Sequence, residues 1–326
     1  MELRRLGTSS LEISPIVFGA WAIGGWMWGG TQEDDAIAAI HAAIDNGVNM
    51  IDTAAIYGMG LSEELVAKAV AGRRNKVLIA TKCGMRWDDP QERGTDPWPN
   101  QKPDGTPVTV RKNSKPDSIA YECEQSLKRL KTDVIDLYQI HWPDTSTPVE
   151  ESIAAMEKLR KEGKVRAIGV SNYNAEWLAR AQAVAPIASL QPPYSVLRRD
   201  IEKDLVPLCQ KHNIGIIVYS PMERGLLTGK VTPDRTFPAG DHRASHPLFT
   251  PENRQKVLDS LEKIRPICER HNATFAQVII NWTFRQPGIT AAIVGARNAE
   301  QAEQNAGALR FTLSDQELKQ IADAFA

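Results

Sequence analysis

Four polar residues with complementary acid–base chemistry stand at or just after the ends of apolar segments. Asp52 and Tyr57 lie in the segment Ile-Asp-Thr-Ala-Ala-Ile-Tyr (51–57), Lys82 ends Ala-Thr-Lys (80–82), and His141 follows Tyr-Gln-Ile (138–140). A phenol, with an ordinary pKa of about 10, is a poor acid near neutral pH. We expect Lys82 to lower the pKa of Tyr57 by favouring the phenolate, and Asp52 to keep the lysine charged and oriented. With His141 donating a hydrogen bond to a substrate oxygen, this set suits the reduction of a carbonyl group.

Each of these residues also has an ordinary structural interpretation. Asp52 can cap the next helical turn, and Lys82 can be a rim lysine that reaches solvent. Tyr57 can simply pack, and a single histidine such as His141 is more often structural than catalytic. The chemical interpretation depends on the four residues together, because all four side chains are expected to project into the same opening of the fold. No Ser-His-Asp or Cys-His arrangement has a comparable placement.

Short apolar segments alternate with helical patterns along almost the whole chain. Most of the predicted strands are continuous apolar runs, typical of parallel strands buried on both faces, and they span residues 17–19, 49–52, 77–81, 134–140, 165–170, 187–191, 214–219 and 290–294. The predicted helices span residues 34–46, 62–71, 116–130, 149–162, 175–183, 201–212, 251–271, 275–285, 299–306 and 315–324.

About eight strand–helix units in 326 residues predict an α/β fold, a (β/α)8 TIM barrel with long loops at its C-terminal face. We expect residues 1–326 to form this one domain. A doubly wound sheet is the weaker alternative, because no GxGxxG motif opens a helix after the first strand.

Two connections, residues 84–115 and 222–249, are unusually long and rich in Pro, Gly and charge. Both follow strands at the end of a barrel that carries active sites, so we expect them to wall a substrate site. The second contains His242 and His246, whose spacing invites a metal site. We expect no metal there, because the pair lies in a loop with Asp241 as its only close carboxylate.

Tryptophans gather in the segments that follow strand ends: Trp21, Trp26, Trp28, Trp87, Trp98 and Trp142. Aromatic side chains near a mouth can clamp an apolar or ring-shaped substrate. We expect about half of them to pack in the core and Trp21 and Trp142 to contact substrate.

The composition narrows the function classes. The 39 Lys plus Arg and 40 Asp plus Glu give a formal net charge of -1, which provides no basic field for nucleic acid or an anionic membrane. The four cysteines are far apart and form no CxxC pair, so neither a zinc site nor a disulfide framework is expected. No stretch approaches the roughly 18 unbroken apolar residues of a membrane span, and no apolar region follows the N-terminal arginines, so we expect a cytoplasmic protein.

The motifs around these residues resemble those of the aldo-keto reductase superfamily. The matches, which cover essentially the whole chain in the right order, are Phe-Gly-Ala-Trp (18–21), Ile-Asp-Thr-Ala-Ala-Ile-Tyr-Gly (51–58), Ala-Thr-Lys (80–82), Asp-Leu-Tyr-Gln-Ile-His (136–141), Gly-Lys-Val-Arg-Ala-Ile-Gly-Val-Ser-Asn (163–172), Gln191, Tyr-Ser-Pro-Met (219–222) and Gly-Leu-Leu-Thr-Gly-Lys (225–230). The chain is most similar to the bacterial branch of stress-induced and inositol-catabolism reductases, which is related to the potassium-channel β-subunits.

The resemblance implies an NADPH-dependent reductase of aldehydes or ketones, with the reverse alcohol oxidation. Its catalytic tetrad would be Asp52, Tyr57, Lys82 and His141, with Tyr57 as the acid and base. The implied cofactor-binding residues are Ala20, Trp21, Asp52, Ser171, Asn172, Gln191, Tyr219, Ser220, Pro221, Met222, Gly225, Lys230, Gly295, Arg297, Gln301 and Asn305. The implied substrate contacts are Trp21, Tyr57, His141 and Trp142.

Within that set, the resemblance assigns the nicotinamide carboxamide to Ser171, Asn172 and Gln191, and ring stacking to Tyr219. We favour NADPH over NADH because Lys230 and Arg297 can both face a 2′-phosphate. The chain departs from the family where Gln-Asn (304–305) replaces the frequent Glu-Asn, although an amide still hydrogen-bonds the adenine amino group.

The alternative function is a binding subunit that senses the cofactor state, as the channel β-subunits do. The complete tetrad favours the enzyme over this alternative. A barrel with lyase or isomerase activity is disfavoured, because the sequence shows neither a glycine-rich phosphate-binding loop nor a set of metal-binding residues.

Overall fold

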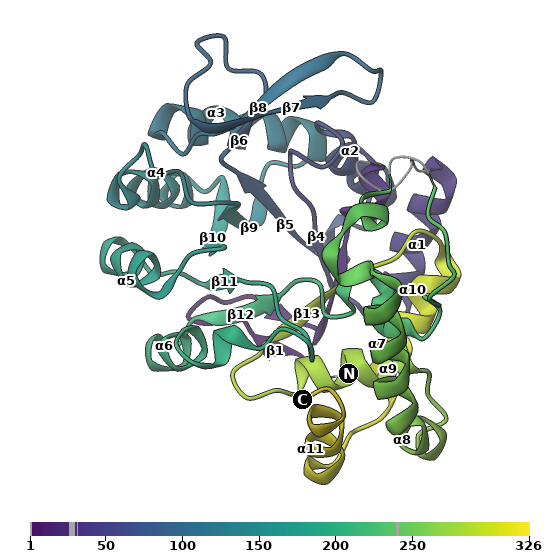
Figure 1. The fold of residues 1–326 in the computed structure, drawn as a ribbon. Coiled ribbons are helices and arrows are strands. Elements are labelled where there is room, and N and C mark those ends of the chain that lie inside the picture. Colours follow the sequence, from purple (N-terminus) through teal and green to yellow (C-terminus); the bar gives the residue numbers. More distant parts are fainter. Residues whose placement is uncertain (1, 26–29, 31, 239–240) are drawn as a thin grey trace.

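The computed structural model describes residues 2–25, 30, 32–238 and 241–326, and its centre is a closed barrel of eight strands (Figure 1). In chain order these are β3 (Ile16–Gly19), β4 (Met50–Asp52), β5 (Leu78–Cys83), β9 (Ile135–Ile140), β10 (Val165–Ser171), β11 (Ser189–Gln191), β12 (Gly215–Val218) and β13 (Ala291–Gly295). Each pairs in parallel with the next, and β13 closes the ring against β3. The predicted (β/α)8 barrel is confirmed, and each predicted strand overlaps an observed one.

Helices surround the barrel (Figure 1): α1 (Glu33–Asp45), α2 (Leu61–Ala69), α3 (Pro116–Leu130), α4 (Val149–Lys161), α5 (Ala175–Val184), α6 (Leu205–His212), α7 (Pro251–Lys263), α8 (Arg265–Arg270), α9 (Phe275–Phe284), α10 (Ala299–Ala306) and α11 (Asp315–Ala324). The helix predicted over 251–271 is divided into α7 and α8, because Pro266 lacks an amide proton and fits only in a first turn. For the same reason α6 begins at Leu205, two residues before Pro207, rather than at 201. Among the described residues, no helix is both long enough and apolar enough to cross a membrane.

An N-terminal hairpin packs on the barrel interior. It pairs β1 (Arg4–Arg5) with β2 (Glu12–Ile13). Its buried side chains Leu6, Leu11 and Ile13 form one apolar cluster with barrel residues such as Val17 and Met50. Burial of this apolar surface favours folding by about 25 cal/mol per Å². The hairpin thus covers the end of the barrel where strands begin, and the polar residues after the strand ends meet at the opposite end.

The connection after β5 is a small antiparallel sheet, which corrects the loop predicted for residues 84–115. Strands β6 (Met85–Arg86), β7 (Thr95–Gln101) and β8 (Pro107–Lys112) pair in the order β6-β8-β7. The prolines at 97 and 99 hide β7 in the sequence, since proline cannot donate to a ladder and is tolerated only on an edge strand. Val110 and Met85 pack with Ile56 in a cluster that Tyr57 borders. The sheet therefore forms a wall beside Tyr57.

The connection after β12 is built from short 3₁₀ turns, η4 (Glu223–Thr228), η5 (His242–Ser245) and η6 (Pro247–Phe249). Arg254 of α7 holds the middle of this connection in place, because its Nη1 donates to the backbone oxygens of Pro233 at 3.2 Å and Arg235 at 2.7 Å. The guanidinium of Arg254 also lies 5.0 Å from the ring centroid of Phe237. This loop is thus held against the barrel, where it forms a second wall.

Candidate active site

Asp52, Tyr57, Lys82 and His141 meet at the carboxyl ends of the neighbouring strands β4, β5 and β9. Lys82 Nζ donates to Asp52 Oδ1 at 2.6 Å, to the backbone oxygen of Thr53 at 2.8 Å and to Tyr57 Oη at 3.4 Å. The rings of Tyr57 and His141 lie edge to face with centroids 5.7 Å apart. Lys82 is 1% exposed and Asp52 is 3% exposed, so the two form a buried ion pair beneath the phenol.

Burial controls the protonation of these groups. Burial, and to a smaller extent the charge of Asp52, raises the pKa of Tyr57 well above its ordinary value. The sequence-based expectation that Lys82 lowers this pKa is wrong here, because desolvation of the phenolate dominates. Burial lowers the pKa of Lys82, although Asp52 acts in the opposite direction. Burial and the charge of Lys82 hold the pKa of His141 well below its ordinary value, so the imidazole is neutral and donates through one N–H.

A second polar cluster supports the other oxygen of Asp52. It joins Gln191, which the sequence predicted as a cofactor contact, to Gln139 and Ser189, which it did not predict. Gln191 Nε2 donates to Asp52 Oδ2 at 2.8 Å, and Gln139 Nε2 donates to it at 3.4 Å. Gln139 Oε1 accepts from Ser189 Oγ at 3.3 Å and from Gln191 Nε2 at 3.5 Å. Gly169 makes room for the cluster, because a Cβ there would lie 2.2 Å from Ser189 Oγ. The available signal was Gln139 itself, an uncharged polar residue within a predicted barrel strand.

A cavity of about 560 Å³ extends from this group along the open end of the barrel. The predicted site residues that line it are Trp21, Asp52, Tyr57, His141, Trp142, Ser171, Asn172, Gln191, Tyr219, Ser220, Pro221, Met222, Gly225, Lys230, Gly295, Arg297, Gln301 and Asn305. Lys82 lies below the cavity floor. Ala20 is fully buried and does not line the cavity, and its N–H donates to the backbone oxygen of Asp52 at 2.8 Å, so its cofactor contact stays a prediction.

Near the tetrad, hydrogen-bonding side chains form one connected wall. Tyr219 Oη donates to Asn172 Oδ1 at 2.9 Å. Asn172 Nδ2 donates to the backbone oxygen of His141 at 2.9 Å and to Ser171 Oγ at 3.1 Å. Asn172 takes a left-handed backbone with φ of 61°, which asparagine tolerates better than most residues. Because Gln191 Nε2 is engaged with Asp52, Gln191 presents its amide oxygen as the acceptor for an amide ligand.

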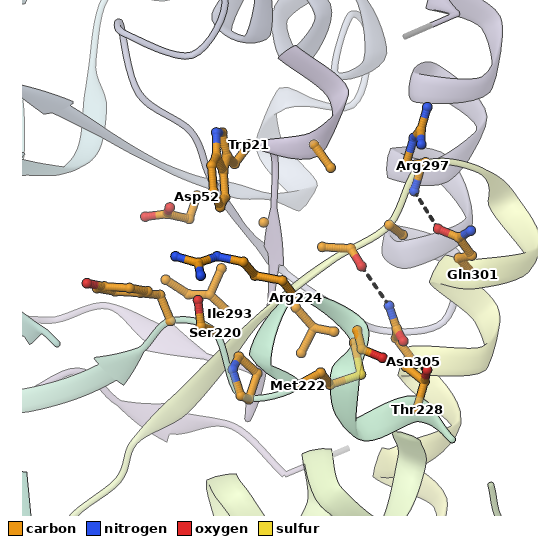
Figure 2. A pocket seen from close by; sticks show the side chains of 18 of the residues that line it. Trp21, Asp52, Ser220, Met222, Arg224, Thr228, Ile293, Arg297, Gln301 and Asn305 are labelled. Atoms are coloured by element: carbon orange, nitrogen blue, oxygen red, sulfur yellow. Dashed lines mark hydrogen bonds between the residues drawn. The ribbon is translucent and has the colours of Figure 1, made fainter. Parts of the chain in front are cut away.

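The far end of the cavity is basic and lies at the start of α10. Figure 2 shows Arg297, Gln301 and Asn305 side by side there, with the Arg297 backbone N–H donating to Gln301 Oε1 at 3.0 Å. Asn305 Nδ2 donates to the backbone oxygen of Gly295 at 3.1 Å. Helix N-termini and arginines both favour phosphate oxygens. Amide partners at one end and cations at the other therefore fit a nicotinamide dinucleotide.

The sequence matches the model of the aldo/keto reductase family over residues 15–325. The chain belongs to this family. This aldo/keto reductase is 37% identical over 324 residues to the aldo-keto reductase YhdN of Bacillus subtilis, covering 98% of this chain and 92% of that protein. It is 36% identical over 328 residues to an NADH-specific methylglyoxal reductase of Escherichia coli, covering 98% of each.

A solved structure of a glycerol dehydrogenase from Gluconobacter oxydans is similar to this aldo/keto reductase with a TM-score of 0.87 and 39% identity, over 99% of this chain and 94% of that one. The family assignment makes this protein an oxidoreductase that acts on carbonyl or alcohol groups with a nicotinamide cofactor. The finer resemblance to inositol-catabolism reductases and channel β-subunits stays a prediction.

Three arginines of the loop after β12 line the cavity of this aldo/keto reductase but were not predicted: Arg224, Arg235 and Arg243. Arg243 Nη2 is paired with Asp241 Oδ2 at 2.6 Å. The segment around Arg224 bends through consecutive left-handed residues, with φ of 43° at Glu223, 56° at Arg224 and 92° at Gly225. The sequence shows that the loop is rich in charge, but only its path shows which arginines face inward.

The tryptophans divide between cavity and packing. Trp21 lines the cavity with its ring centroid 6.4 Å from that of Tyr57, and Trp142 lines it at 38% exposure. Trp87 and Trp98 instead pack under the β6-β8-β7 sheet. Trp26 and Trp28 lie outside the described residues.

The histidine pair of the long loop contacts side chains of the cavity wall. The ring centroid of His242 is 5.4 Å from that of Trp21. His246 Nε2 contacts Arg224 Nη1, and His246 Nδ1 accepts from the Leu248 N–H at 3.2 Å. Across the part of the chain that is described, no three His, Cys, Asp or Glu side chains are grouped as a metal ion requires.

Proposed function

We propose that this chain is an NADPH-dependent reductase of aldehydes or ketones that also catalyses the reverse oxidation, with Tyr57 as the acid and base. The observation that supports this most directly is the contact of Lys82 Nζ with Asp52 Oδ1 at 2.6 Å and with Tyr57 Oη at 3.4 Å. This trio lies at the floor of a cavity whose far end is basic.

Tyr57 holds the proton that the carbonyl oxygen receives. Its raised pKa keeps the phenol protonated at neutral pH. An alkoxide is a stronger base than a phenolate, so the proton moves from Tyr57 Oη as negative charge grows on the substrate oxygen. Lys82 Nζ then stabilises the phenolate from 3.4 Å, and Asp52 balances the charge of the lysine throughout.

His141 positions the substrate oxygen rather than protonating it. Its low pKa keeps the imidazole neutral, and a neutral N–H polarises a carbonyl without giving up its proton. When bound, a reduced nicotinamide supplies the hydride to the carbonyl carbon. Ser171, Asn172 and Gln191 would hold its carboxamide, and Tyr219 would stack on its ring, which fixes the face that is presented to the substrate.

The preference for NADPH rests on Lys230 and Arg297, two cations that line the basic end of the cavity. The methylglyoxal reductase relative is named as NADH-specific, so the two cofactors must be compared directly. We expect Arg297→Met to raise the Kd of NADPH about tenfold through the loss of one charge-assisted contact, and to leave the Kd of NADH within twofold. An equal loss for both cofactors contradicts a role at the 2′-phosphate.

The substrate we propose is a short, polar aldehyde or ketone. The printed names of two relatives refer to methylglyoxal and glycerol, which are both three-carbon molecules. Trp21, Met85 and Trp142 line the cavity beside Tyr57 and would contact the remainder of the substrate. A panel of aldehydes graded by chain length, scored by NADPH consumption, tests the size limit.

The decisive experiment is Tyr57→Phe. We expect turnover to fall by a factor of about 10² to 10⁴, the usual contribution of a general acid, while NADPH still binds with its wild-type Kd. Tyr121→Phe is the matched control, because Tyr121 is 40% exposed and its hydroxyl donates to Asp88 Oδ2 at 2.8 Å, away from the residues that line the cavity. Turnover near the wild-type rate in Tyr57→Phe rules out the proposed role. The cofactor-sensing subunit stays an alternative prediction, which steady turnover by the wild-type protein contradicts.

A further inference from the structure

Arg224 is a cation of the cavity wall that forms no ion pair with any carboxylate of the described residues. Among the described residues, no Asp or Glu oxygen lies within 4.0 Å of its guanidinium, whereas Arg243 on the same wall is paired with Asp241. Arg224 Nε is buried and has no hydrogen-bond partner. The adjacent carboxylate, Glu223, accepts from Ser195 Oγ at 2.7 Å. Burying a guanidinium even in part is costly unless an anion or a hydrogen-bond acceptor compensates it.

Among the described residues, the side chain that bonds to the Arg224 guanidinium is His246, and it does not supply the acceptor that the guanidinium needs. Arg224 Nη1 contacts His246 Nε2. His246 Nδ1 accepts from the Leu248 N–H at 3.2 Å and must therefore be unprotonated. A neutral imidazole then carries its proton on Nε2, which makes Nε2 a donor facing another donor. His246 therefore does not supply the acceptor that the guanidinium needs.

The backbone aims this side chain into the cavity. Arg224 has a left-handed φ of 56° between the left-handed Glu223 and Gly225, a conformation that a non-glycine residue rarely adopts. Strain of this kind tends to persist where function requires it. In Figure 2 the guanidinium extends to the side of Asp52 and Trp21, away from Arg297 and Asn305.

Arg224 belongs to the catalytic end of the cavity by its electrostatic neighbours as well. The charge of Arg224 and the phenol of Tyr57 both act on Tyr219, the side chain expected to stack on the cofactor ring. Of the other arginines of the wall, Arg235 and Arg297 bond to backbone oxygens, and Arg243 is paired with Asp241.

We propose that Arg224 binds an anionic oxygen group, a phosphate or a carboxylate, at the catalytic end of the cavity. The ligand has two sources: the diphosphate of the dinucleotide, or an acidic group that the substrate carries beside its carbonyl. Either would give the planar guanidinium the paired oxygens that the protein does not provide. The proposal rests on the proposed function, because it assigns Arg224 to the same cavity.

The test uses Arg224→Met, which keeps most of the side-chain volume, and Arg224→Lys, which keeps the charge but not the planar fork. Arg265→Met is the matched control, because Arg265 forms an exposed ion pair with Glu262 on the outside of the barrel. Two quantities are measured: the Kd of NADPH and NADH by fluorescence, and kcat and KM for glyoxylate, succinic semialdehyde and 4-formylbenzoate, each beside its methyl ester. Thermal unfolding verifies that each variant is folded.

Two results support the proposal and identify the source. If Arg224→Met raises the Kd of both cofactors about tenfold to a hundredfold, and the ratio of the KM for each acid to the KM for its methyl ester is unchanged, Arg224 binds the diphosphate. An increase of that size in KM for the acids alone, with esters and cofactor unchanged, assigns it to the substrate. Arg224→Lys should lose less than Arg224→Met in either case.

Changes below about threefold in both quantities, in folded protein, overturn the proposal. If Arg224→Met does not fold, the same criterion applies to Arg224→Lys. If the wild-type protein reduces none of the aldehydes, the proposed function fails by itself, and the cofactor Kd alone then decides the role of Arg224.

Discussion

Replacing Lys82 by methionine isolates the energetics of the buried ion pair. Lys82 Nζ is the donor to Asp52 Oδ1 at 2.6 Å and to the Thr53 carbonyl at 2.8 Å. Methionine has a similar length and leaves little cavity, but it donates no hydrogen bond. Asp52 then keeps a buried charge supported on one oxygen only, through Gln191 at 2.8 Å and Gln139 at 3.4 Å.

The expected cost follows from removing one member of a buried pair, which is about 3–5 kcal/mol. For a chain of 326 residues the unfolding entropy is roughly 0.7 kcal/mol per kelvin, so the melting temperature should fall by about 4–7 °C. Asp52→Asn should cost less, because burial already lowers the pKa of Lys82, so the lysine can lose its proton when its partner is removed.

The assay is a double-variant cycle by calorimetry at pH 7.5, with Lys82→Met, Asp52→Asn and the two combined. The double variant buries neither charge. Its loss of unfolding free energy should therefore be about 2–3 kcal/mol smaller than the sum of the losses in the two single variants. Losses that add within about 0.5 kcal/mol would show that the two side chains do not interact energetically, and would refute this account of the site.

Three further outcomes follow from the same buried polar groups. Gln139→Leu should lower kcat about tenfold with the cofactor Kd unchanged, because Asp52 and Gln191 lose a shared partner; an unchanged kcat would mean that the cluster only fills space. His141 has a pKa below that of an unfolded histidine, so only the unfolded chain binds its proton below about pH 6.5, and stability should fall as the pH decreases by up to roughly 1.4 kcal/mol per unit. Thermal unfolding from pH 5 to 7 should show a smaller fall in His141→Gln. Burial raises the pKa of Glu122 to about 8, so the folded chain alone holds that proton between about pH 4.5 and 8. The contribution of Glu122 to stability should therefore decrease as the pH rises through this window, opposite in sign to the contribution of His141. Glu122→Gln should flatten that decrease, and parallel curves for variant and wild type would contradict it.

Much of the fold was predictable because its local signals agree with its global arrangement. The predicted helix 116–130 and the helices 299–306 and 315–324 coincide with α3, α10 and α11. The eight apolar strands could be counted, since a parallel strand covered on both faces is apolar throughout. The helix break before Pro266 was readable in principle from the proline itself. The β6-β8-β7 sheet was not readable, because its prolines and charges are typical of a loop and its pairing joins residues far apart in sequence.

The chemistry of the site divides in the same way. Residue type and strand position placed Asp52, Tyr57, Lys82 and His141 at one mouth, because parallel strands in a barrel all end on the same side. Their pKa shifts were beyond sequence reasoning, since desolvation depends on how completely neighbouring elements exclude water. The prediction for Tyr57 had the wrong sign for that reason.

The sequence by itself determined the alternation of strands and helices, the family and the four residues at the strand ends. Tertiary structure alone decided that Gln139 reaches Asp52 from the next barrel layer, that Ala20 lies behind the wall, and that Arg224 faces the cavity uncompensated. The physical reason is the distance along the chain over which each property is determined. Apolar periodicity and strand ends are local properties of the chain, whereas burial, counterions and hydrogen-bond partners are supplied by residues that only the closed barrel brings together.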